Sequence, residues 1–213
     1  MRVIVTRAAE QSGPLAHALR AHGFEVAECP LIRVQRIDDG PIETSAYEWV
    51  VVTSANGAAE LARRHAGPLP RVAAIGPATA ATLAEHGIAA DFVPSSATQD
   101  ALVAEFPRPY GRILFVGAES ARRLLVSELG ADFRPVYRTV ELRPDPPPEG
   151  DLVVLASPSA ARAFGALGRP IPAVTIGPQT TAAALGAGVD VRAEARTHDL
   201  EGVVSAVEAV AAQ

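Results

Sequence analysis

Short runs of consecutive apolar residues alternate along the chain with longer, alanine-rich segments of helical periodicity. Uninterrupted apolar runs are typical of strands buried on both faces, as in a parallel sheet, because half-exposed strands alternate apolar and polar residues. Segments of this kind, most of them continuous apolar runs, predict strands at Val3–Val5, Val26–Ile32, Trp49–Thr53, Val72–Ile75, Asp91–Val93, Ile113–Val116, Phe133–Thr139, Leu152–Ala156, Ala173–Ile176 and Val189–Arg192. The periodic segments predict helices at Ser12–His22, Asn56–His65, Ala78–His86, Thr98–Glu105, Ser120–Leu129, Ser159–Ala166, Gln179–Leu185 and Asp199–Ala211. This alternation predicts an α/β fold with parallel sheets and right-handed crossovers.

The chain contains an internal repeat. Val52–Ala58 returns as Leu155–Ala161, and Ala74–Ala80 returns as Thr175–Thr181, in each case about 100 residues later. In both copies a strand runs into a turn of Ser, Thr, Gly or Pro that opens a helix, where backbone N–H groups are available to an anion. We therefore expect an internal duplication that supplies two walls of a cleft for one anionic ligand.

Two segments rich in proline and acidic residues, residues 36–41 and 143–150, fall inside the repeat units rather than between them. Such segments act as semi-rigid spacers. If they join two domains, the first domain comprises residues 1–35 and 147–213, the second comprises residues 41–140, and residues 36–40 and 141–146 form a two-stranded linker. Two consecutive domains divided near residues 108–111 would fit the pattern equally well.

Composition and charge narrow the class of protein. The chain has 213 residues, 48% of them hydrophobic and 20% charged, which suits one large or two small globular domains. A net charge of −5 and the lack of an arginine-rich tract argue against nucleic acid as a partner. No apolar run approaches membrane-spanning length and the chain starts directly with a predicted strand, so we expect a cytoplasmic protein that binds no membrane. One cysteine and five scattered histidines predict neither a disulfide nor a metal site.

Two serines stand where a nucleophile elbow would place a catalytic serine, after a strand and before a helix. Ser54 and Ser157 lack the flanking glycines and the His and Asp partners of such an elbow. A helix N-cap explains both better, because a serine hydroxyl at that position accepts a hydrogen bond from the first helical turn. We predict that these caps, with neighbouring amides such as that of Ala55, face the ligand.

Gly-Pro dipeptides open two further predicted helices. Gly76 and Gly177 would let a ligand approach the backbone closely, and a proline in the first turn loses nothing by lacking an N–H group. Thr79 and Thr180 would each add a hydroxyl donor in the same turn. We predict a carboxylate or phosphate seat at each turn; the alternative is a helix start without a ligand.

Three side chains next to predicted strand ends complete the candidate site. Tyr137 ends a strand beside the second linker, where its hydroxyl would donate a proton or a hydrogen bond to a ligand; packing at the strand end is the alternative. Arg7 and Arg138 are the cations best placed for an acidic ligand. Neither a dinucleotide fingerprint nor a Walker loop occurs, so we expect no nucleotide cofactor.

Taken in order, these motifs resemble those of the uroporphyrinogen-III synthase family over essentially the whole chain. The resemblance is carried by Val5–Arg7, Thr53–Gly57, Ile75–Ala80, Phe115–Ala118, Val136–Thr139, Ala156–Ala160 and Thr175–Thr181. It implies two flavodoxin-like parallel-sheet domains joined by a two-stranded linker, which favours the discontinuous domain assignment. It also implies a monomer without cofactor or metal that closes hydroxymethylbilane, a linear tetrapyrrole polycarboxylate, to uroporphyrinogen III with inversion of ring D and loss of water.

The resemblance also assigns roles to residues. Tyr137 matches the family's tyrosine that is suspected of assisting departure of the substrate hydroxyl. Thr79 and Thr180 match threonines on the cleft walls, and the serine turns match those whose amides hold carboxylates. The full set of predicted substrate-binding residues is Arg7, Ser54, Ala55, Gly76, Thr79, Gly117, Arg138, Ser157, Ser159, Gly177 and Thr180, of which the two arginines rest on electrostatics alone.

Two other function classes stay open at this point. One is a hinged two-domain module that closes on an anionic ligand without chemistry. The other is a synthase-like module that has lost activity and serves regulation. For the enzyme, transient contact with the preceding enzyme of the pathway is the protein partner we expect.

Overall fold

The computed structural model describes residues 1–212, and of Glu10 only the backbone. The contacts divide the chain into two compact units. Unit 1 comprises residues 1–34 and the segment from residue 139 to the C-terminal end, and unit 2 comprises residues 35–138. Two consecutive domains divided near residues 108–111 do not fit these contacts, because that segment lies within unit 2. The predicted domain bounds, 1–35 with 147–213 and 41–140, stay a prediction about folding units.

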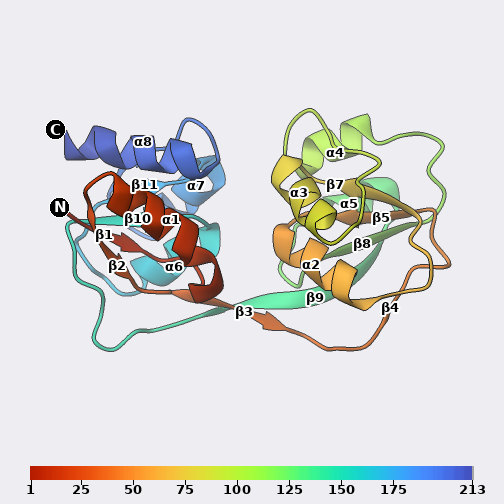
Figure 1. Ribbon diagram of the computed structural model, residues 1–213, viewed down its shortest axis with the longest axis horizontal. Coiled ribbons are helices and arrows are strands. Elements are labelled where there is room, and N and C mark those ends of the chain that lie inside the picture. The colour runs from red at the N-terminus through yellow and green to blue at the C-terminus, as the bar shows by residue number, and fades with distance from the viewer. Residues whose placement is uncertain (213) are drawn as a thin grey trace. The chain divides into compact units, whose positions relative to one another are not determined.

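Unit 1 is a five-stranded parallel sheet with helices on both faces (Figure 1). Its strands are β1 (Arg2–Val5), β2 (Glu25–Glu28), β10 (Leu152–Leu155), β11 (Ala173–Thr175) and β12 (Val191–Glu194), in the order β12-β11-β10-β1-β2. Its helices are α1 (Ala9–Ala21), α6 (Pro158–Gly165), α7 (Pro178–Gly186) and α8 (Leu200–Ala211). In chain order this is 2-1-3-4-5, the flavodoxin-like arrangement.

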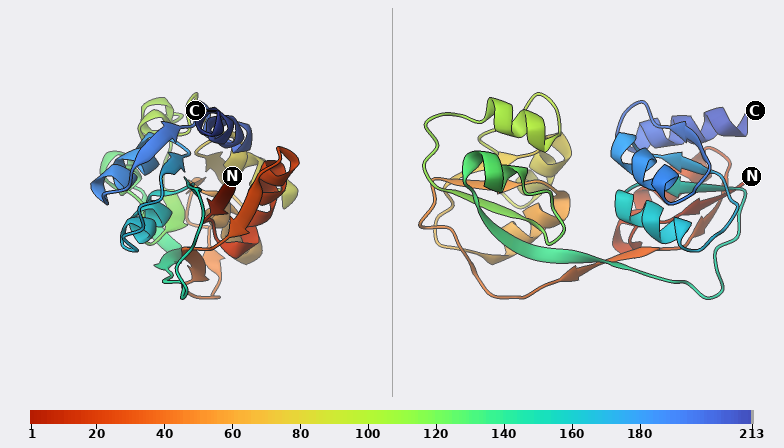
Figure 2. Two further views of the ribbon diagram at one scale, coloured as in Figure 1. Left: turned by 90° about the vertical axis from the view of Figure 1, so that its left-hand side faces the viewer. Right: turned by 180° about the vertical axis from the view of Figure 1, so that it is seen from behind.

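Alternate strand residues of unit 1 enter two separate cores. Val3 and Val5 pack with Leu15 and Leu19 of α1 and with α8 on one face. Ile4 packs with α6 and α7 on the other face, where those two helices lie against each other (Figure 2). Because successive side chains of a strand point to opposite faces, a continuous apolar run fills both cores.

Unit 2 contains a second five-stranded sheet, in the order β3-β9-β8-β5-β7. Its strands are β3 (Ile32–Arg36), β5 (Trp49–Val52), β7 (Arg71–Ala74), β8 (Ile113–Ala118) and β9 (Asp132–Glu141), and β4 (Ile42–Glu43) pairs with β6 (His65–Ala66) in a separate small sheet. Its helices are α2 (Ala55–Arg64), α3 (Pro77–Glu85), α4 (Gln99–Glu105) and α5 (Leu124–Leu129). Helices α4 and α5 pack on one face over a core around Trp49 and Phe115, and α2 packs with α3.

The neighbours β9-β8-β5-β7 repeat the layout β2-β1-β10-β11 of unit 1. This likeness agrees with the repeat in the sequence, and a common origin of the two halves stays a prediction. The neighbouring strands β3 and β9 carry the chain between the units (Figures 1 and 2). Both strands extend into the predicted linkers, since Arg36 ends β3 and Glu141 ends β9.

Three predicted elements differ from the structure. The strand predicted over Val26–Ile32 is divided into β2 and β3 around Pro30, which has no N–H group for a sheet ladder. The strand predicted over Asp91–Val93 is reduced to a single bridge between Phe92 and Ala73. The helix predicted from Ser120 begins only at Leu124, where the Arg123 guanidinium lies 3.5 Å from the centre of the Phe133 ring and donates to the Glu119 carbonyl. Within residues 1–212, we find no helix with the length and apolar character needed to cross a membrane.

Candidate functional site

Four helices begin where parallel strands end, and eight of the twelve predicted site residues lie at these starts. Helix α2 follows β5 and α3 follows β7 in unit 2, while α6 follows β10 and α7 follows β11 in unit 1. Since β5 and β7 pair in parallel, as do β10 and β11, the two starts of each unit lie at the same edge of its sheet. The first-turn N–H groups of a helix carry partial positive charge, so each edge favours an anion.

The two serines cap their helices in the same way, which confirms the predicted N-caps. Ser54 Oγ accepts a hydrogen bond from the Gly57 N–H at 3.0 Å, and Ser157 Oγ accepts one from the Ala160 N–H at 3.2 Å. Ser159 lies in the first turn of α6, where its hydroxyl is 3.5 Å from the Arg162 guanidinium. In each cap, one lone pair of the serine oxygen accepts a hydrogen bond from the helix. Among the hydrogen bonds of the described residues, no serine is paired with a histidine that could act as its base.

Tyr137 is joined to the cap of α2. Its hydroxyl donates to Ser54 Oγ at 3.0 Å, across 83 positions of sequence, and the residue is only 7% exposed. The pairing of β8 with β9 shifts register between Gly117 and Ala118, so that Gly117 faces Pro135 while Ala118 faces Tyr137. Such a bulge changes the face toward which the following side chain points. Here the bulge comes just before Tyr137. In the part of the chain that the structure describes, no other tyrosine hydroxyl is recorded as bonding to a helix cap.

The Gly-Pro starts of α3 and α7 have no side-chain cap. That their glycines admit a ligand stays a prediction, and the packing within each unit gives a separate reason for glycine at both positions. A Cβ on Gly76 would lie 2.6 Å from the Cβ of Ala97, and a Cβ on Gly177 would lie 2.8 Å from the imidazole of His198. Each glycine therefore makes room for the loop that returns over the helix start.

The two first-turn threonines are buried in this conformation. Thr79 is 5% exposed and Thr180 is 3% exposed, although both were predicted to offer hydroxyls to a ligand. The prolines before them and the residues at the second helical position, Ala78 and Gln179, are exposed instead. The described surface of these helix starts therefore consists mainly of the proline and the residue after it.

The remaining predicted residues lie beside the point where the helices of each sheet change face. In unit 1, β1 and β10 are neighbouring strands, but the helices that follow them, α1 and α6, pack on opposite faces of the sheet. In unit 2, β8 and β5 are neighbours in the same way, and the helices that follow them, α5 and α2, also pack on opposite faces. Ligands of open α/β sheets bind outside the carboxyl ends of the strands at such a switch point. Arg7 and Ser157 follow the two strands in unit 1, and Gly117 and Ser54 stand at the same ends in unit 2.

The two arginines differ in their surroundings. Arg7 is half-buried, burial lowers the pKa of its guanidinium, and no acidic partner for it occurs among the side chains that the structure describes. Arg138 is exposed, and its Nε donates to the Gln35 side chain at 3.2 Å. A partly desolvated guanidinium binds a carboxylate more strongly than one in water, so of the two arginines Arg7 offers the stronger attraction to an anion.

Two further residues complete the predicted set. Ala55, the first residue of α2, is exposed beside the Ser54 cap. A Cβ on Gly117 would lie 3.0 Å from the ring of Phe115, a tight contact that favours glycine there. Among the described residues, no group of three or more His, Cys, Asp and Glu side chains is placed to hold a metal ion.

Sequence reasoning missed a charged cluster in unit 2 formed by Asp38, Glu60, Arg64 and Arg134. Its members come from three elements and are separated by up to 96 positions in the chain. No local sequence pattern predicts such a cluster, because each of its residues taken alone looks like an ordinary charged surface residue.

Comparison with known proteins agrees with this fold and these motifs. The profile of the family described as uroporphyrinogen-III synthase HemD matches residues 13–205. A uroporphyrinogen-III synthase of Synechococcus elongatus is 30% identical over 59% of this chain and 53% of its own length. A putative uroporphyrinogen-III synthase of Archaeoglobus fulgidus is 32% identical over 67% of this chain and 62% of its own length. The matched part of the chain thus spans between about half and two thirds of these relatives.

The fold has a counterpart among solved structures. The crystal structure of a mutant uroporphyrinogen III synthase from Thermus thermophilus superposes with a TM-score of 0.64, covering 100% of this chain and 99% of that one at 15% identity. The likeness supports the two-unit α/β architecture, and the family profile covers most of the chain. This protein belongs to the uroporphyrinogen-III synthase family.

Proposed function

We propose that this protein is an active uroporphyrinogen-III synthase, which closes hydroxymethylbilane to uroporphyrinogen III with inversion of ring D and loss of water. Family membership supports the reaction class. The observation that carries the proposal is the hydrogen bond between Tyr137 and Ser54 at the switch point of unit 2, because it places a buried proton donor beside helix amides.

The substrate dictates what the protein has to supply. Loss of the terminal hydroxyl gives an azafulvene cation, and the substituted carbon of ring D then attacks to form a spiro intermediate that fragments and closes at the other carbon. Hydroxymethylbilane also closes unaided to the type I isomer, so the enzyme's main task is to hold the chain in the conformation that favours attack by the substituted carbon. Helix starts in each unit, with Arg7 in unit 1, are the proposed carboxylate receptors.

The hydroxyl pair suits assistance to the leaving hydroxyl. Ser54 Oγ accepts from both the Gly57 N–H and the Tyr137 O–H, and a hydroxyl has two lone pairs and one proton. Its own proton is therefore directed to a third acceptor. We assign that acceptor to the departing hydroxyl, which leaves as water after receiving the Ser54 proton, while the Tyr137 hydroxyl passes its own proton to Ser54 Oγ.

We further propose that the enzyme works as a monomer in the cytoplasm, without cofactor or nucleic acid, and meets the enzyme that makes its substrate only transiently. Hydroxymethylbilane is short-lived in water, so a brief encounter that transfers it would limit unaided closure. Binding without chemistry, or a regulatory role, has no specific observation in its favour.

An assay of isomers tests the proposal. Freshly made hydroxymethylbilane is supplied to the protein, and the type I and type III products are resolved after oxidation. We expect type III product faster than the unaided reaction, and only type I at the unaided rate would overturn the proposal.

Tyr137→Phe should lose at least about tenfold in kcat, as expected for loss of an acid in proton transfer. Tyr110→Phe is the matched control, since Tyr110 packs on Phe106 in the same unit and makes no contact with Ser54.

A further inference from the structure

The charged cluster of unit 2 links three elements around one carboxylate. Asp38 lies in the loop after β3 and pairs with Arg64 of α2. The same carboxylate accepts from the Nη2 of Arg134 on β9, with 3.2 Å to each of its oxygens. We call Asp38, Glu60, Arg64 and Arg134 the Asp38 cluster.

Glu60 and Arg64 anchor the cluster on the inner side of α2. The side chain of Arg64 is 2% exposed; its Nε donates to the Gly40 carbonyl at 2.8 Å, and its Nη1 lies 3.5 Å from Glu60. Glu60 also pairs with Arg36 of β3 and with Arg63, each at 2.8 Å. Burial alone would raise the pKa of Glu60, but the hydrogen bonds from Arg63 and Arg36 outweigh it and lower that pKa, so the carboxylate stays ionised.

This arrangement fastens helix α2 to strand β9 at two places. Near the helix N-terminus, Ser54 accepts the Tyr137 hydroxyl. Near its C-terminus, Arg64 reaches Asp38, which in turn holds Arg134, three positions before Tyr137. The register shift of β9 lies between Arg134 and Tyr137, so an ordinary ladder does not by itself fix the tyrosine at this point.

We infer that the Asp38 cluster is a positioning device that holds the bulged part of β9 so that Tyr137 meets Ser54. Its members are positioning residues, since none of them touches the hydroxyl pair. The inference rests on the proposed function for its kinetic consequence, but the position of Tyr137 can be measured independently of activity.

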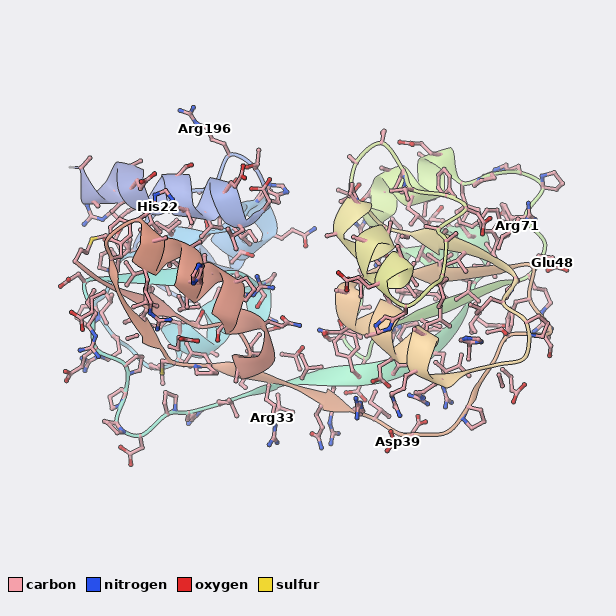
Figure 3. The ribbon with its side chains drawn as sticks, viewed as in Figure 1. His22, Arg33, Asp39, Glu48, Arg71 and Arg196 are labelled. Carbon is pink, nitrogen blue, oxygen red and sulfur yellow. The ribbon has the colours of Figure 1, made fainter. Side chains whose placement is uncertain are left out.

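Asp38→Asn is the first test variant. Asp38 accepts hydrogen bonds from two guanidinium groups, and both of its oxygens take part. In asparagine an NH2 group replaces one of these oxygens, so a donor would then point at a guanidinium donor and that hydrogen bond would be lost. Asp39→Asn is the matched control. Asp39, labelled in Figure 3, is the next residue, and its side chain is 77% exposed. Its ion-pair partner is Arg63 rather than Arg64 or Arg134. Arg134→Met is a second variant that releases β9 and leaves Asp38 its buried partner Arg64, so it tests the inference even if Asp38→Asn does not fold.

Kinetics separate positioning from a merely structural role. For Asp38→Asn and Arg134→Met we expect kcat to fall about tenfold or more with KM nearly unchanged, because small displacements of a catalytic group are costly. In the Tyr137→Phe background the same substitutions should cause no further loss. An equal loss in both backgrounds would overturn the inference, since the cluster would then act by another route.

Amide exchange gives a second measurement that needs no substrate. The Glu119 N–H donates to the Tyr137 carbonyl at 2.8 Å, and the Ile37 N–H donates to the Val136 carbonyl at 3.2 Å. Both amides should exchange faster in Asp38→Asn and Arg134→Met than in wild type or Asp39→Asn. Unchanged exchange at both would overturn the inference. If wild type forms only type I product, the proposed function fails, while faster exchange would still support the positioning of Tyr137.

Discussion

Gly76→Ala tests why glycine opens helix α3. The φ angle of Gly76 is −175°, which any residue adopts, so backbone strain cannot explain the glycine. The explanation offered by the structure is space: an added Cβ would lie 2.6 Å from the Ala97 Cβ and 3.4 Å from the Ala97 Cα. Carbon atoms normally pack at about 3.5–4.0 Å, so the loop that carries Ala97 would have to move by about 1 Å.

The magnitude follows from this clash and two smaller effects. Overpacking typically costs about 1–3 kcal/mol, and replacing glycine by alanine at an N-cap adds up to about 1 kcal/mol. Reduced freedom of the unfolded chain returns about 0.4–1 kcal/mol. Because Ala97 is exposed, its loop can yield, and we expect a net loss near the lower end, about 1–2 kcal/mol. For a chain of this size each kcal/mol lowers Tm by about 2–4 °C.

Thermal unfolding of four proteins provides the assay: wild type, Gly76→Ala, Ala97→Gly and the double variant. The double variant removes the Cβ that the new side chain meets, so its Tm should recover most of the loss. A Gly76→Ala Tm within about 1 °C of wild type, or a double variant no better than the sum of the singles, would refute the packing explanation. A double variant with restored Tm but weakened substrate binding would support ligand approach as a second reason for the glycine.

Three further predictions concern the caps and Arg7. Ser54→Ala should lower Tm more than Ser157→Ala, because each loses a cap worth about 1 kcal/mol but only the first leaves the buried Tyr137 hydroxyl without its acceptor, at a further cost of about 1–3 kcal/mol; equal Tm values would contradict this. Asp199 caps α8, and the hydrogen bonds from the Gly202 N–H and, to a smaller extent, the Thr197 hydroxyl lower the pKa of its carboxyl. Its contribution to the free energy of unfolding is therefore present above the unfolded-state pKa and is lost as pH falls through the folded-state pKa. Asp199→Thr keeps a hydroxyl cap that does not titrate, and the variant should lose less Tm than wild type between about pH 5 and pH 3; parallel Tm curves would be the contrary result. Arg7→Gln should raise KM for hydroxymethylbilane several-fold and leave Tm unchanged or higher, since it removes a partly desolvated charge; an unchanged KM would remove Arg7 from the proposed site.

The sequence was a good guide wherever the decisive interaction was local. The serine caps span three residues, and continuous apolar runs marked strands that fill cores on both faces. The Gly-Pro starts were also located correctly. The packing reason for their glycines could not be predicted, because the atoms that a Cβ would meet belong to Ala97 and His198, about 20 residues further along the chain.

Interactions between distant segments were beyond sequence reasoning. Nothing near Ser54 indicates that its partner is Tyr137, and the Asp38 cluster unites charges from β9, α2 and the loop after β3. Strand β9 was predicted as an ordinary strand, and its register shift depends on pairing with β8. Helix caps and strands could therefore be predicted from local sequence patterns, but the strand pairing that turns Tyr137 toward the Ser54 cap could not.

The likeness of the two units makes their differences informative. When the sheets are matched on their serine caps, strand pairing puts Arg7 of unit 1 at the place of Gly117 in unit 2. Helix starts that favour anions therefore occur in both units, whereas the hydroxyl pair occurs in unit 2 and the half-buried cation in unit 1. We expect that recognition of carboxylates draws on both units, while assistance to the leaving hydroxyl depends on unit 2. Arg7→Gln should then act mainly on KM and Tyr137→Phe mainly on kcat, and the reverse distribution would show that the chemistry does not follow this division.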